Sequence, residues 1–417
     1  MFKRNIIEML EKSLARSRVV LLNGARQVGK TTLVRDLLKH KNYTYITFDD
    51  EITYLAAKGN ITEFVAGLKK PIIIDEIQRV PEIFLAIKRD VDVYHEPGRY
   101  LITGSANPLL LPRLGDSLAG RMEVIDLMPL SQGELINQKE SFIDAAFNQS
   151  LSLAPLQPLS KDALYKKIIT GGYPAAQMLD QEGLDAWMRN YINLLLQRDI
   201  RDLAQIEKLT EMPNLLRILA NRASNLLNVA EIAREIKLEV KTVHRYLALL
   251  ETIFLVSLQN PWSTNITQRF IKSPKISLID SGLLAYLLDT NLEKALSNQT
   301  HMGKIVENFV VGELKKQATW SKKTINLYHC RTADGIEVDI VLEDRSGNII
   351  GIEIKSSQRV LPDDFKGLKY LQEKMAGKFI MGVVFCMNPQ PLCFGANLYA
   401  LPIQALWENV ADEQHFS

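Results

Sequence analysis

The sequence of 417 residues lacks several features that mark special classes of protein. Its three cysteines, Cys330, Cys386 and Cys393, are too few for a disulfide scaffold and do not have the spacing of a metal site. The longest apolar runs, such as Leu194–Leu196 and Pro71–Ile74, are far shorter than the roughly 18 residues that a membrane-spanning helix needs. The N-terminal segment MFKRNIIEMLEKSLARSR is charged throughout and lacks an apolar core, so we expect no secretory signal. With so few cysteines and such short apolar runs, we expect a cytoplasmic protein with no membrane partner.

The sequence also lacks an excess of charge of one sign. Fifty Lys and Arg residues balance 48 Asp and Glu residues, which leaves a net charge of +2. Binding to nucleic acid must therefore depend on local basic patches. Hydrophobic residues make up 47% and charged residues 24%, a globular balance that excludes disordered, collagen-like and coiled-coil chains. At roughly 100–200 residues per domain, this length predicts two to four domains.

Residues 1–135 alternate short apolar strands with helical segments, the pattern of a parallel sheet that is covered on both faces. The predicted helices follow Lys30 and cover Ile83–Asp92. The predicted strands are Val19–Asn23, Tyr43–Phe48, Pro71–Asp75, Tyr100–Gly104 and Glu123–Leu127.

The segment GARQVGKTT, residues 24–32, fits the phosphate-binding pattern G-x-x-x-x-G-K-[ST] and lies between a predicted strand and a predicted helix. Glycines let backbone N–H groups turn toward phosphate oxygens, and the helix N-terminus adds the positive end of its dipole. We expect Lys30 to reach the β- and γ-phosphates of ATP and Thr31 to bind Mg²⁺ through its hydroxyl. The predicted ATP-binding residues are Gly24, Ala25, Arg26, Gln27, Val28, Gly29, Lys30, Thr31 and Thr32.

Polar residues at the ends of other strands complete the predicted ATPase site. Asp75 ends a buried-type strand, where it would support Mg²⁺, and Glu76 is the expected base that orients an attacking water. Ser105 follows the fourth strand and is expected near the γ-phosphate, with a plain turn at the strand end as the alternative. Arg121 precedes the fifth strand and is a candidate for a residue that completes a neighbouring copy's site, with Arg113 as the competitor. A plain surface arginine is the alternative for both.

These features resemble an AAA-type P-loop ATPase of a bacterial and archaeal branch whose C-terminal domain has no characterised function. The segments IDEIQRVP (74–81) and LAGRMEVIDLMPLSQGE (118–134) carry the resemblance. The GG-x-P turn at Gly171–Pro174 is similar to part of that branch's helical lid. The resemblance covers nearly the whole chain and implies ATP and ADP as ligands. We therefore expect an α/β fold, with a parallel-sheet ATPase core over 1–135 and a helical lid or linker over 136–220.

Residues 228–256 are predicted to form a helix–turn–helix, with helices at Val229–Ile236 and Val240–Leu255. The resembling family has a winged-helix module here, which we place at residues 221–265. The apolar face of the second helix consists of Val240, Val243, Leu247, Leu250 and Phe254.

The candidates for DNA contact lie off that face, near the start of the second helix, where a recognition helix meets the major groove. They are Lys241, Thr242, His244 and Arg245. The alternatives are a helical linker and a module that contacts protein. Acidic residues weaken the case for DNA, namely Glu231, Glu235, Glu239 and Glu251.

Residues 266–417 are predicted to form a second α/β domain, with a hairpin turn around Asp344–Asn348. Its predicted helices are Gly303–Gln317 and Asp363–Lys374. Its predicted strands are Ile276–Asp280, Ile325–Cys330, Glu337–Glu343, Ile349–Lys355 and Phe379–Phe385.

Alternation along two of these strands brings Asp339, Glu353 and Lys355 to one end of a hairpin. Glu307 lies among apolar residues of a predicted helix, which is unusual unless the carboxylate is paired. Close carboxylates repel one another, so the simplest expectation is a bound Mg²⁺ or Mn²⁺ that activates water. Asp339 and Glu353 are the predicted metal ligands.

This set resembles the PD-(D/E)XK nuclease superfamily. Glu307 matches its helix acid, Asp339 its first strand acid, and Glu353 with Lys355 its E-x-K motif. The favoured function is therefore an ATPase coupled to a metal-dependent nuclease-like domain that acts on DNA. The alternatives are a solvated acidic sheet edge, a nuclease fold used as a scaffold, and a nucleotide-dependent switch that binds a protein partner and never cuts.

Overall fold

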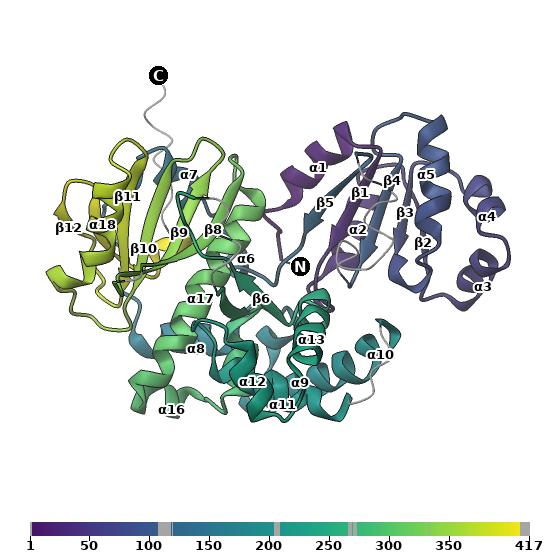
Figure 1. Ribbon diagram of the computed structural model, residues 1–417. Coiled ribbons are helices and arrows are strands. Elements are labelled where there is room, and N and C mark those ends of the chain that lie inside the picture. The colour runs from purple at the N-terminus through teal and green to yellow at the C-terminus, as the bar shows by residue number, and fades with distance from the viewer. Residues whose placement is uncertain are drawn as a thin grey trace, which may run out of the picture. The chain divides into compact units, whose positions relative to one another are not determined.

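The computed structural model describes residues 2–106, 118, 120–203, 209–265, 269, 273–332 and 334–408, and it contains two compact units (Figure 1). The N-terminal unit comprises Arg4–Pro129 and Tyr246–Leu255. The C-terminal unit comprises Met1–Lys3, Leu130–Arg245 and Val256–Ser417. None of the described helices is both long and apolar enough to cross a membrane.

A five-stranded parallel sheet forms the centre of the N-terminal unit, as the sequence predicts. Its strand order is β2-β3-β4-β1-β5, so β4 separates the phosphate-loop strand β1 from β3, which ends in the two acids. Each observed strand lies within one residue of its predicted bounds. The strands are β1 (Val19–Asn23), β2 (Thr44–Thr47), β3 (Ile72–Asp75), β4 (Tyr100–Gly104) and β5 (Met122–Asp126).

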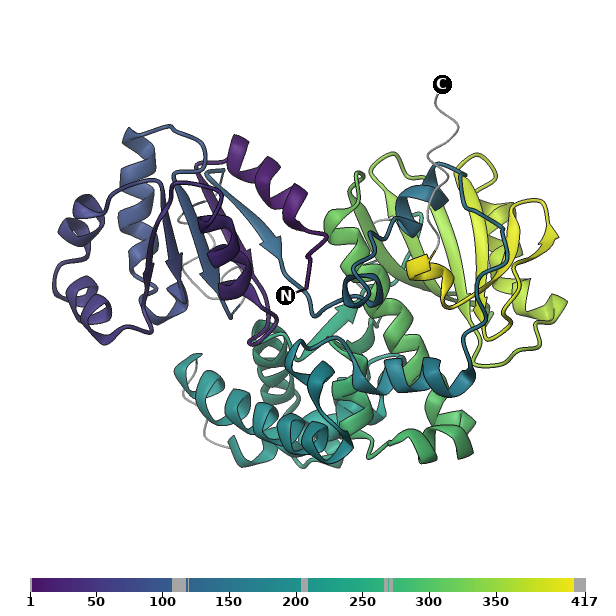
Figure 2. The same cartoon turned by 180° about the vertical axis from the view of Figure 1, so that it is seen from behind.

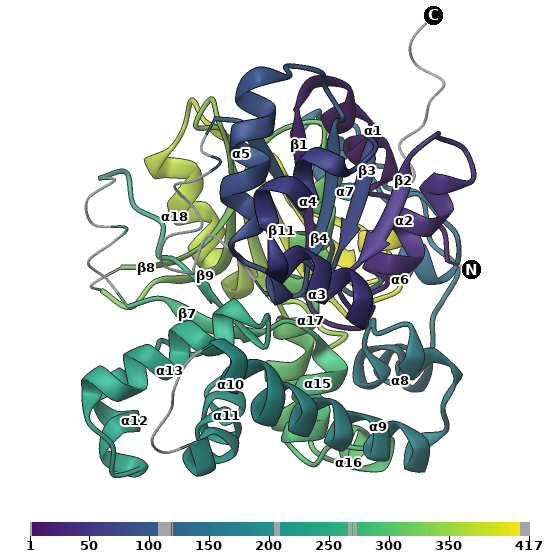
Figure 3. The same ribbon diagram turned by 90° about the vertical axis from the view of Figure 1, so that its right-hand side faces the viewer.

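The helices of the N-terminal unit cover both faces of this sheet because its strands are parallel and their crossovers are right-handed. Helices α2 and α5 lie on opposite faces (Figure 3). The residues of β1, β3 and β4 are all buried. The helices are α1 (Ile7–Arg16), α2 (Lys30–Leu38), α3 (Glu51–Gly59), α4 (Ile61–Gly67) and α5 (Ile83–Val93), with a 3-10 turn η1 (Ile77–Arg79).

A six-stranded mixed sheet forms part of the C-terminal unit, in the order β12-β13-β11-β10-β9-β8. Helix α18 packs on one face (Figure 1), and α17 and α7 pack on the other (Figure 2). The strands are β8 (Ile325–Arg331), β9 (Glu337–Asp344), β10 (Ile349–Ile354), β11 (Phe379–Cys386), β12 (Leu392–Gly395) and β13 (Leu398–Pro402).

Helices make up most of the rest of the C-terminal unit, together with an antiparallel pair β6 (Val256–Gln259) and β7 (Lys275–Leu278). The helices are α6 (Gln132–Leu135), α7 (Phe142–Phe147), α8 (Lys161–Thr170), α9 (Gln181–Leu194), α10 (Ile200–Leu203), α11 (Met212–Asn221), α12 (Val229–Glu235), α13 (Val240–Thr252), α15 (Ser281–Leu287), α16 (Leu292–Ser297), α17 (Gln299–Trp320), α18 (Lys366–Lys374) and α19 (Ala405–Glu408). Only the part of α13 up to Arg245 belongs to this unit.

Several details of the predicted elements are wrong. Strand β6 was not predicted, and β7 begins one residue before and ends two residues before its predicted bounds. Strands β12 and β13 were not predicted, because their short segments lie among proline, glycine and asparagine residues that are typical of loops. Helix α17 begins before and ends after its predicted bounds. Helix α13 ends at Thr252, so Phe254 lies beyond it with φ at 59°, and Val240 is 45% exposed instead of belonging to an apolar face.

Candidate functional site

The phosphate-binding pattern lies in the turn between β1 and α2, at the carboxyl edge of the parallel sheet. Gly24 has φ 151° and Gly29 has φ 99°, values that favour glycine. A Cβ atom on Gly24 would lie 2.2 Å from the backbone oxygen of Leu127. Gly24 is therefore required by close backbone approach as well as by conformation, and Gly29 by conformation.

Lys30 begins α2, and its ammonium lies inside the loop. Its Nζ donates to the carbonyl oxygens of Gly24 and Ala25, both at 2.8 Å. Arg4 supports the loop from outside, because its guanidinium donates to the carbonyl oxygens of Val28 at 2.8 Å and Met128 at 2.6 Å. Sequence reasoning missed Arg4, since it precedes the first predicted strand and belongs to no motif.

Asp75, at the end of β3, connects three hydroxyl groups. Its Oδ2 accepts from Thr31 Oγ1 and from Tyr45 OH, both at 2.8 Å, and its Oδ1 accepts from Thr103 Oγ1. Asp75 is only 2% exposed. The predicted pair of Mg²⁺ residues, Thr31 and Asp75, is therefore in direct contact at the carboxyl edge of the sheet.

Glu76 follows Asp75 in the left-handed region, at φ 59°. Its backbone N–H donates to Thr103 Oγ1 at 3.1 Å. Its carboxylate oxygen Oε2 accepts from Ser105 Oγ at 3.3 Å and also from the side chain of Gln78. The structure thus brings Glu76 and Ser105 together, while Gln78 is a residue that sequence reasoning missed.

Arg121 lies at the opposite edge of the sheet. It directly precedes β5, whose first residue Met122 is level with Val19 at the amino end of β1. Its side chain pairs with Asp92 near the end of α5, and this arginine holds the pKa of that carboxyl below its ordinary value. Arg121 therefore has no access to the phosphate loop of its own chain. The competing candidate, Arg113, lies outside the described residues.

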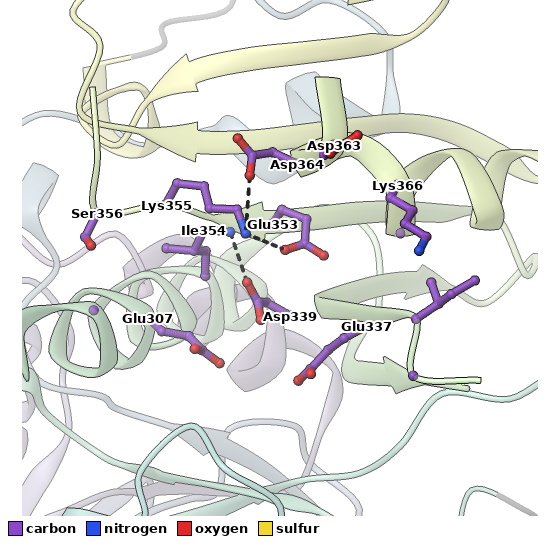
Figure 4. A pocket seen from close by; sticks show the side chains of 14 residues that line it. Glu307, Glu337, Asp339, Glu353, Ile354, Lys355, Ser356, Asp363, Asp364 and Lys366 are labelled. Atoms are coloured by element: carbon purple, nitrogen blue, oxygen red, sulfur yellow. Dashed lines mark hydrogen bonds and ion pairs between the residues drawn. The ribbon is translucent and has the colours of Figure 1, made fainter. Parts of the chain in front are cut away.

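The predicted nuclease-like residues gather around one pocket in the C-terminal unit, with a volume of about 440 Å³ (Figure 4). Glu307 comes from α17, Asp339 from β9 and Glu353 from β10, while Lys355 directly follows β10. Asp339 Oδ2 accepts from the Ile354 backbone N–H at 3.0 Å. The predicted convergence of these four residues is therefore present.

Lys275 on β7 is the residue that this prediction lacked. Its Nζ lies 3.1 Å from Glu307 Oε1, 3.2 Å from Asp339 Oδ1 and 2.9 Å from Glu337 Oε1. The side chain of Lys275 is only 4% exposed. A buried ammonium therefore supplies positive charge beside these carboxylates, and the metal ion expected there stays a prediction.

Burial controls the protonation of these acids. Burial and the neighbouring Asp339 raise the pKa of Glu353 to about 9 and that of Glu307 to about 8. Burial alone would raise the pKa of Glu337 and lower that of Lys275. The charge of Lys275 instead lowers the pKa of Glu337, and the charges of Glu307, Asp339 and Glu337 raise that of Lys275. Burial and the charge of Asp339 therefore favour the protonated forms of Glu307 and Glu353, whereas the nearby lysines favour the ionised forms.

No group of three or more His, Cys, Asp or Glu side chains in the described part of the chain has an arrangement that could hold a metal ion. Lys355 lines the pocket, and its Nζ is 3.7 Å from both Glu353 Oε2 and Asp364 Oδ1. The predicted metal ligands Asp339 and Glu353 thus lie between two lysines.

The candidates for DNA contact lie at the start of α13. Lys241, His244 and Arg245 are exposed, and Thr242 is half-buried. Two of the acids that weakened the case for DNA, Glu231 and Glu235, accept hydrogen bonds from Arg222. Their charge is therefore offset by another arginine.

Comparison with known families divides the chain into three matched regions. An AAA domain matches residues 16–136, a domain of unknown function (DUF8612) matches residues 161–294, and a second domain of unknown function (DUF4143) matches residues 302–406. The AAA match covers the parallel sheet, the phosphate loop and the acids at the end of β3.

Several proteins are similar over most of the chain. Uncharacterized proteins of Mycobacterium bovis and Mycobacterium tuberculosis are each 32% identical over 355 residues, which are 85% of this chain and 74% of theirs. An uncharacterized protein of Methanocaldococcus jannaschii is 23% identical over 380 residues, with 85% and 81% covered.

Two solved structures show a more distant likeness. A Walker-type ATPase of Pyrococcus abyssi is 14% identical, with a TM-score of 0.44 and with 69% of this chain and 96% of that chain covered. The Holliday junction branch migration motor of Thermotoga maritima is 17% identical, with a TM-score of 0.29 and coverages of 61% and 88%. On the sequence matches, the chain belongs to the family of the two mycobacterial proteins, and its N-terminal part is an AAA-type P-loop ATPase domain.

Proposed function

We propose that the protein binds ATP together with Mg²⁺ at the carboxyl edge of its parallel sheet and hydrolyses it slowly. The observation that carries the proposal is the contact between Thr31 and Asp75, with Glu76 beside them and the Lys30 loop at the same edge. An AAA domain provides these parts for nucleotide binding and hydrolysis.

The donor set fits Mg²⁺, because a threonine hydroxyl and a carboxylate are oxygen ligands of the kind that this ion takes. Thr31 and Asp75 would hold the ion, directly or through water, and the bound ion would offset negative charge on the phosphates. The backbone N–H groups of the loop and the Lys30 ammonium bind phosphate oxygens. Glu76 accepts a proton from the attacking water, or orients that water, at its carboxylate.

Two variants test this proposal. Lys30→Ala removes the ammonium from the loop and should abolish tight ATP binding in calorimetry. Glu76→Gln keeps the shape of the side chain and should bind ATP but turn it over at least roughly tenfold more slowly, an increase of about 1.4 kcal/mol in the barrier. Lys39→Ala is the matched control, because Lys39 lies at the other end of α2 and pairs with Asp36. Unchanged ATP affinity in Lys30→Ala would exclude this site.

The pocket of the C-terminal unit supports a second candidate function, cleavage of DNA. The observation in its favour is the convergence of Glu307, Asp339, Glu353 and Lys355 on one pocket. Lys275 opposes it, because the ammonium occupies the space between two of the acids that would take Mg²⁺ or Mn²⁺. Cleavage therefore requires Lys275 to leave these acids.

A nuclease assay on single-stranded, duplex and branched DNA, with Mg²⁺ or Mn²⁺ and with or without ATP, tests this function. Cleavage that Glu353→Ala and Lys355→Ala each remove, while ATP binding is kept, would support it. If the purified protein cuts none of these substrates, the alternative gains support: a nucleotide-dependent switch whose C-terminal unit contacts a protein partner.

DNA contact itself is proposed for α13. Within residues 221–265, the isolated bridge at Leu226, helices α12 and α13, and strand β6 follow one another in the order of a winged helix. Helix α11 ends at the first residue of this range, and β7, the partner of β6, follows the range. We assign residues 221–265 to this module, after an ATPase core at 1–135 and a lid or linker at 136–220, and before a nuclease-like domain at 266–417. Lys241 and the residues beside it would contact DNA phosphates.

A further inference from the structure

Gln78 joins two residues of the ATPase site through one side-chain amide. Its Nε2 donates to Glu76 Oε2 and to Ser105 Oγ, the latter at 2.7 Å. Its Oε1 accepts from the backbone N–H of Ser105 at 3.2 Å. One orientation of the amide therefore satisfies both of its ends, which fixes the end of β3 to the end of β4.

These bonds hold one particular oxygen of the Glu76 carboxylate. Oε2 accepts from Gln78 and from Ser105, while no described residue donates a hydrogen bond to Oε1. The backbone of Glu76 is fixed to the same strand end, through the bond from its N–H to Thr103 Oγ1. The glutamate is thus restrained at both its backbone and one oxygen, and its second oxygen can receive a proton or a water.

We propose that Gln78 is a positioning residue for ATP hydrolysis, a role that rests on the function proposed above. By holding Oε2, it presents Oε1 of Glu76 to the attacking water. A glutamate side chain that is not held samples many rotamers, and fixing it before the reaction lowers the entropy lost at the transition state. One proton of the water passes to Oε1 of Glu76. At the same time the water oxygen attacks the γ-phosphorus, and the bond between this phosphorus and the oxygen of the β-phosphate breaks.

The test measures two quantities for the full chain, the rate of ATP turnover and the affinity for ATP. Gln78→Ala should lower kcat at least roughly tenfold and change the ATP dissociation constant by less than about twofold, because Gln78 acts on the base and not on the phosphates. Arg79→Ala is the matched control. Arg79 lies in the same 3-10 turn, but its side chain pairs with Asp49, so its removal should leave kcat unchanged.

Two further variants separate positioning from a merely structural role. In a Glu76→Gln background, Gln78→Ala should cause no further loss in single-turnover rate, because the group that it positions is already absent. Gln78→Glu keeps the length of the side chain but places a second carboxylate beside that of Glu76, and their repulsion should keep kcat as low as in Gln78→Ala.

The outcomes distinguish this inference from the proposed function. If the wild type has no turnover above that of Lys30→Ala, the proposed function fails. If Glu76→Gln is slow but Gln78→Ala turns over as fast as Arg79→Ala, only the positioning role is overturned. A faster Gln78→Ala enzyme would also overturn it, because the amide would then restrain the base instead of presenting it.

Discussion

At the scale of single residues, Lys275 changes the interpretation of the C-terminal pocket. The four motif residues were predictable because strand alternation and the E-x-K spacing are local patterns. Lys275 was not, since it lies 32 residues before Glu307 and 64 before Asp339, on a different sheet. A sequence can show that acids converge, but it does not show which distant cation meets them.

Substitution of Lys275 by Met should strongly destabilise the C-terminal unit. The change leaves buried carboxylates without their partner, and removing one member of a buried ion pair costs about 3–5 kcal/mol. Urea unfolding followed by tryptophan fluorescence measures the effect. All four tryptophans lie in this unit: Trp187, Trp262, Trp320 and Trp407.

Lys366→Met is the matched control for that experiment, because Lys366 lines the same pocket but is exposed. Its effect should stay within about 0.5 kcal/mol. A loss below about 1 kcal/mol for Lys275→Met would mean that protonation or water already offsets the charge of the acids without the ammonium.

The stability of the C-terminal unit should also fall as pH rises from about 5 to 9. Burial raises the folded-state pKa of Glu353 from 4.5 to about 9, so folding takes up a proton in this window. A raised pKa of this kind stabilises the fold at low pH, and the contribution is lost as pH rises through the folded-state value. For one proton the slope is about 1.4 kcal/mol per pH unit.

Glu353→Gln mimics the protonated form. In this variant the unfolding free energy should fall less steeply with pH, by up to about 1.4 kcal/mol per pH unit. Glu373→Gln on the exposed face of α18 should leave the slope unchanged. Equal slopes in wild type and Glu353→Gln would show that Glu353 is ionised in the folded protein at neutral pH.

At the scale of elements, the parallel sheet was the most predictable part of the fold. Its strands are continuous apolar runs between helical segments, and burial on both faces produces that pattern directly. Strand β12 is largely exposed and β13 follows it closely, so neither carries a comparable signal.

The GG-x-P turn shows what a motif alone does not explain. It was predicted as a turn between helices, and it does lie between α8 and the 3-10 turn Ala175–Met178. Its first two residues must be glycine for tertiary reasons. A Cβ on Gly171 would lie 2.1 Å from Asp280 Oδ1, and one on Gly172 would lie 2.1 Å from the backbone oxygen of Leu130. Both neighbours are distant in sequence.

Helix α13 provides a prediction for DNA binding. If its N-terminal turn contacts phosphates, Lys241→Ala should weaken binding to duplexes of any sequence and reduce the salt slope of log K by about 1. Fluorescence anisotropy at several salt concentrations measures both quantities. Lys369→Ala, an exposed lysine of α18, is the control. An unchanged salt slope in Lys241→Ala would exclude Lys241 from DNA contact.

At the scale of the whole molecule, the two edges of the parallel sheet separate Arg121 from the site that it was predicted to serve. The phosphate loop follows the carboxyl end of β1, whereas Arg121 lies beside the amino end. Five residues of strand span roughly 16 Å at about 3.3 Å per residue. An arginine so placed can reach a bound nucleotide only in another copy of the chain, across a head-to-tail interface.

Mixing two inactive variants tests whether such a shared site exists. Glu76→Gln chains lack the base but keep Arg121, and Arg121→Ala chains have the reverse defect. If copies assemble head to tail, random pairing in an equimolar mixture completes about one quarter of the interfaces, so about that fraction of wild-type turnover should return. Turnover per wild-type chain should also rise with protein concentration, because dilution separates the copies. A mixture no more active than the average of its two components, together with a rate per chain independent of concentration, would show that each chain hydrolyses ATP alone and that Arg121 serves only its pair with Asp92.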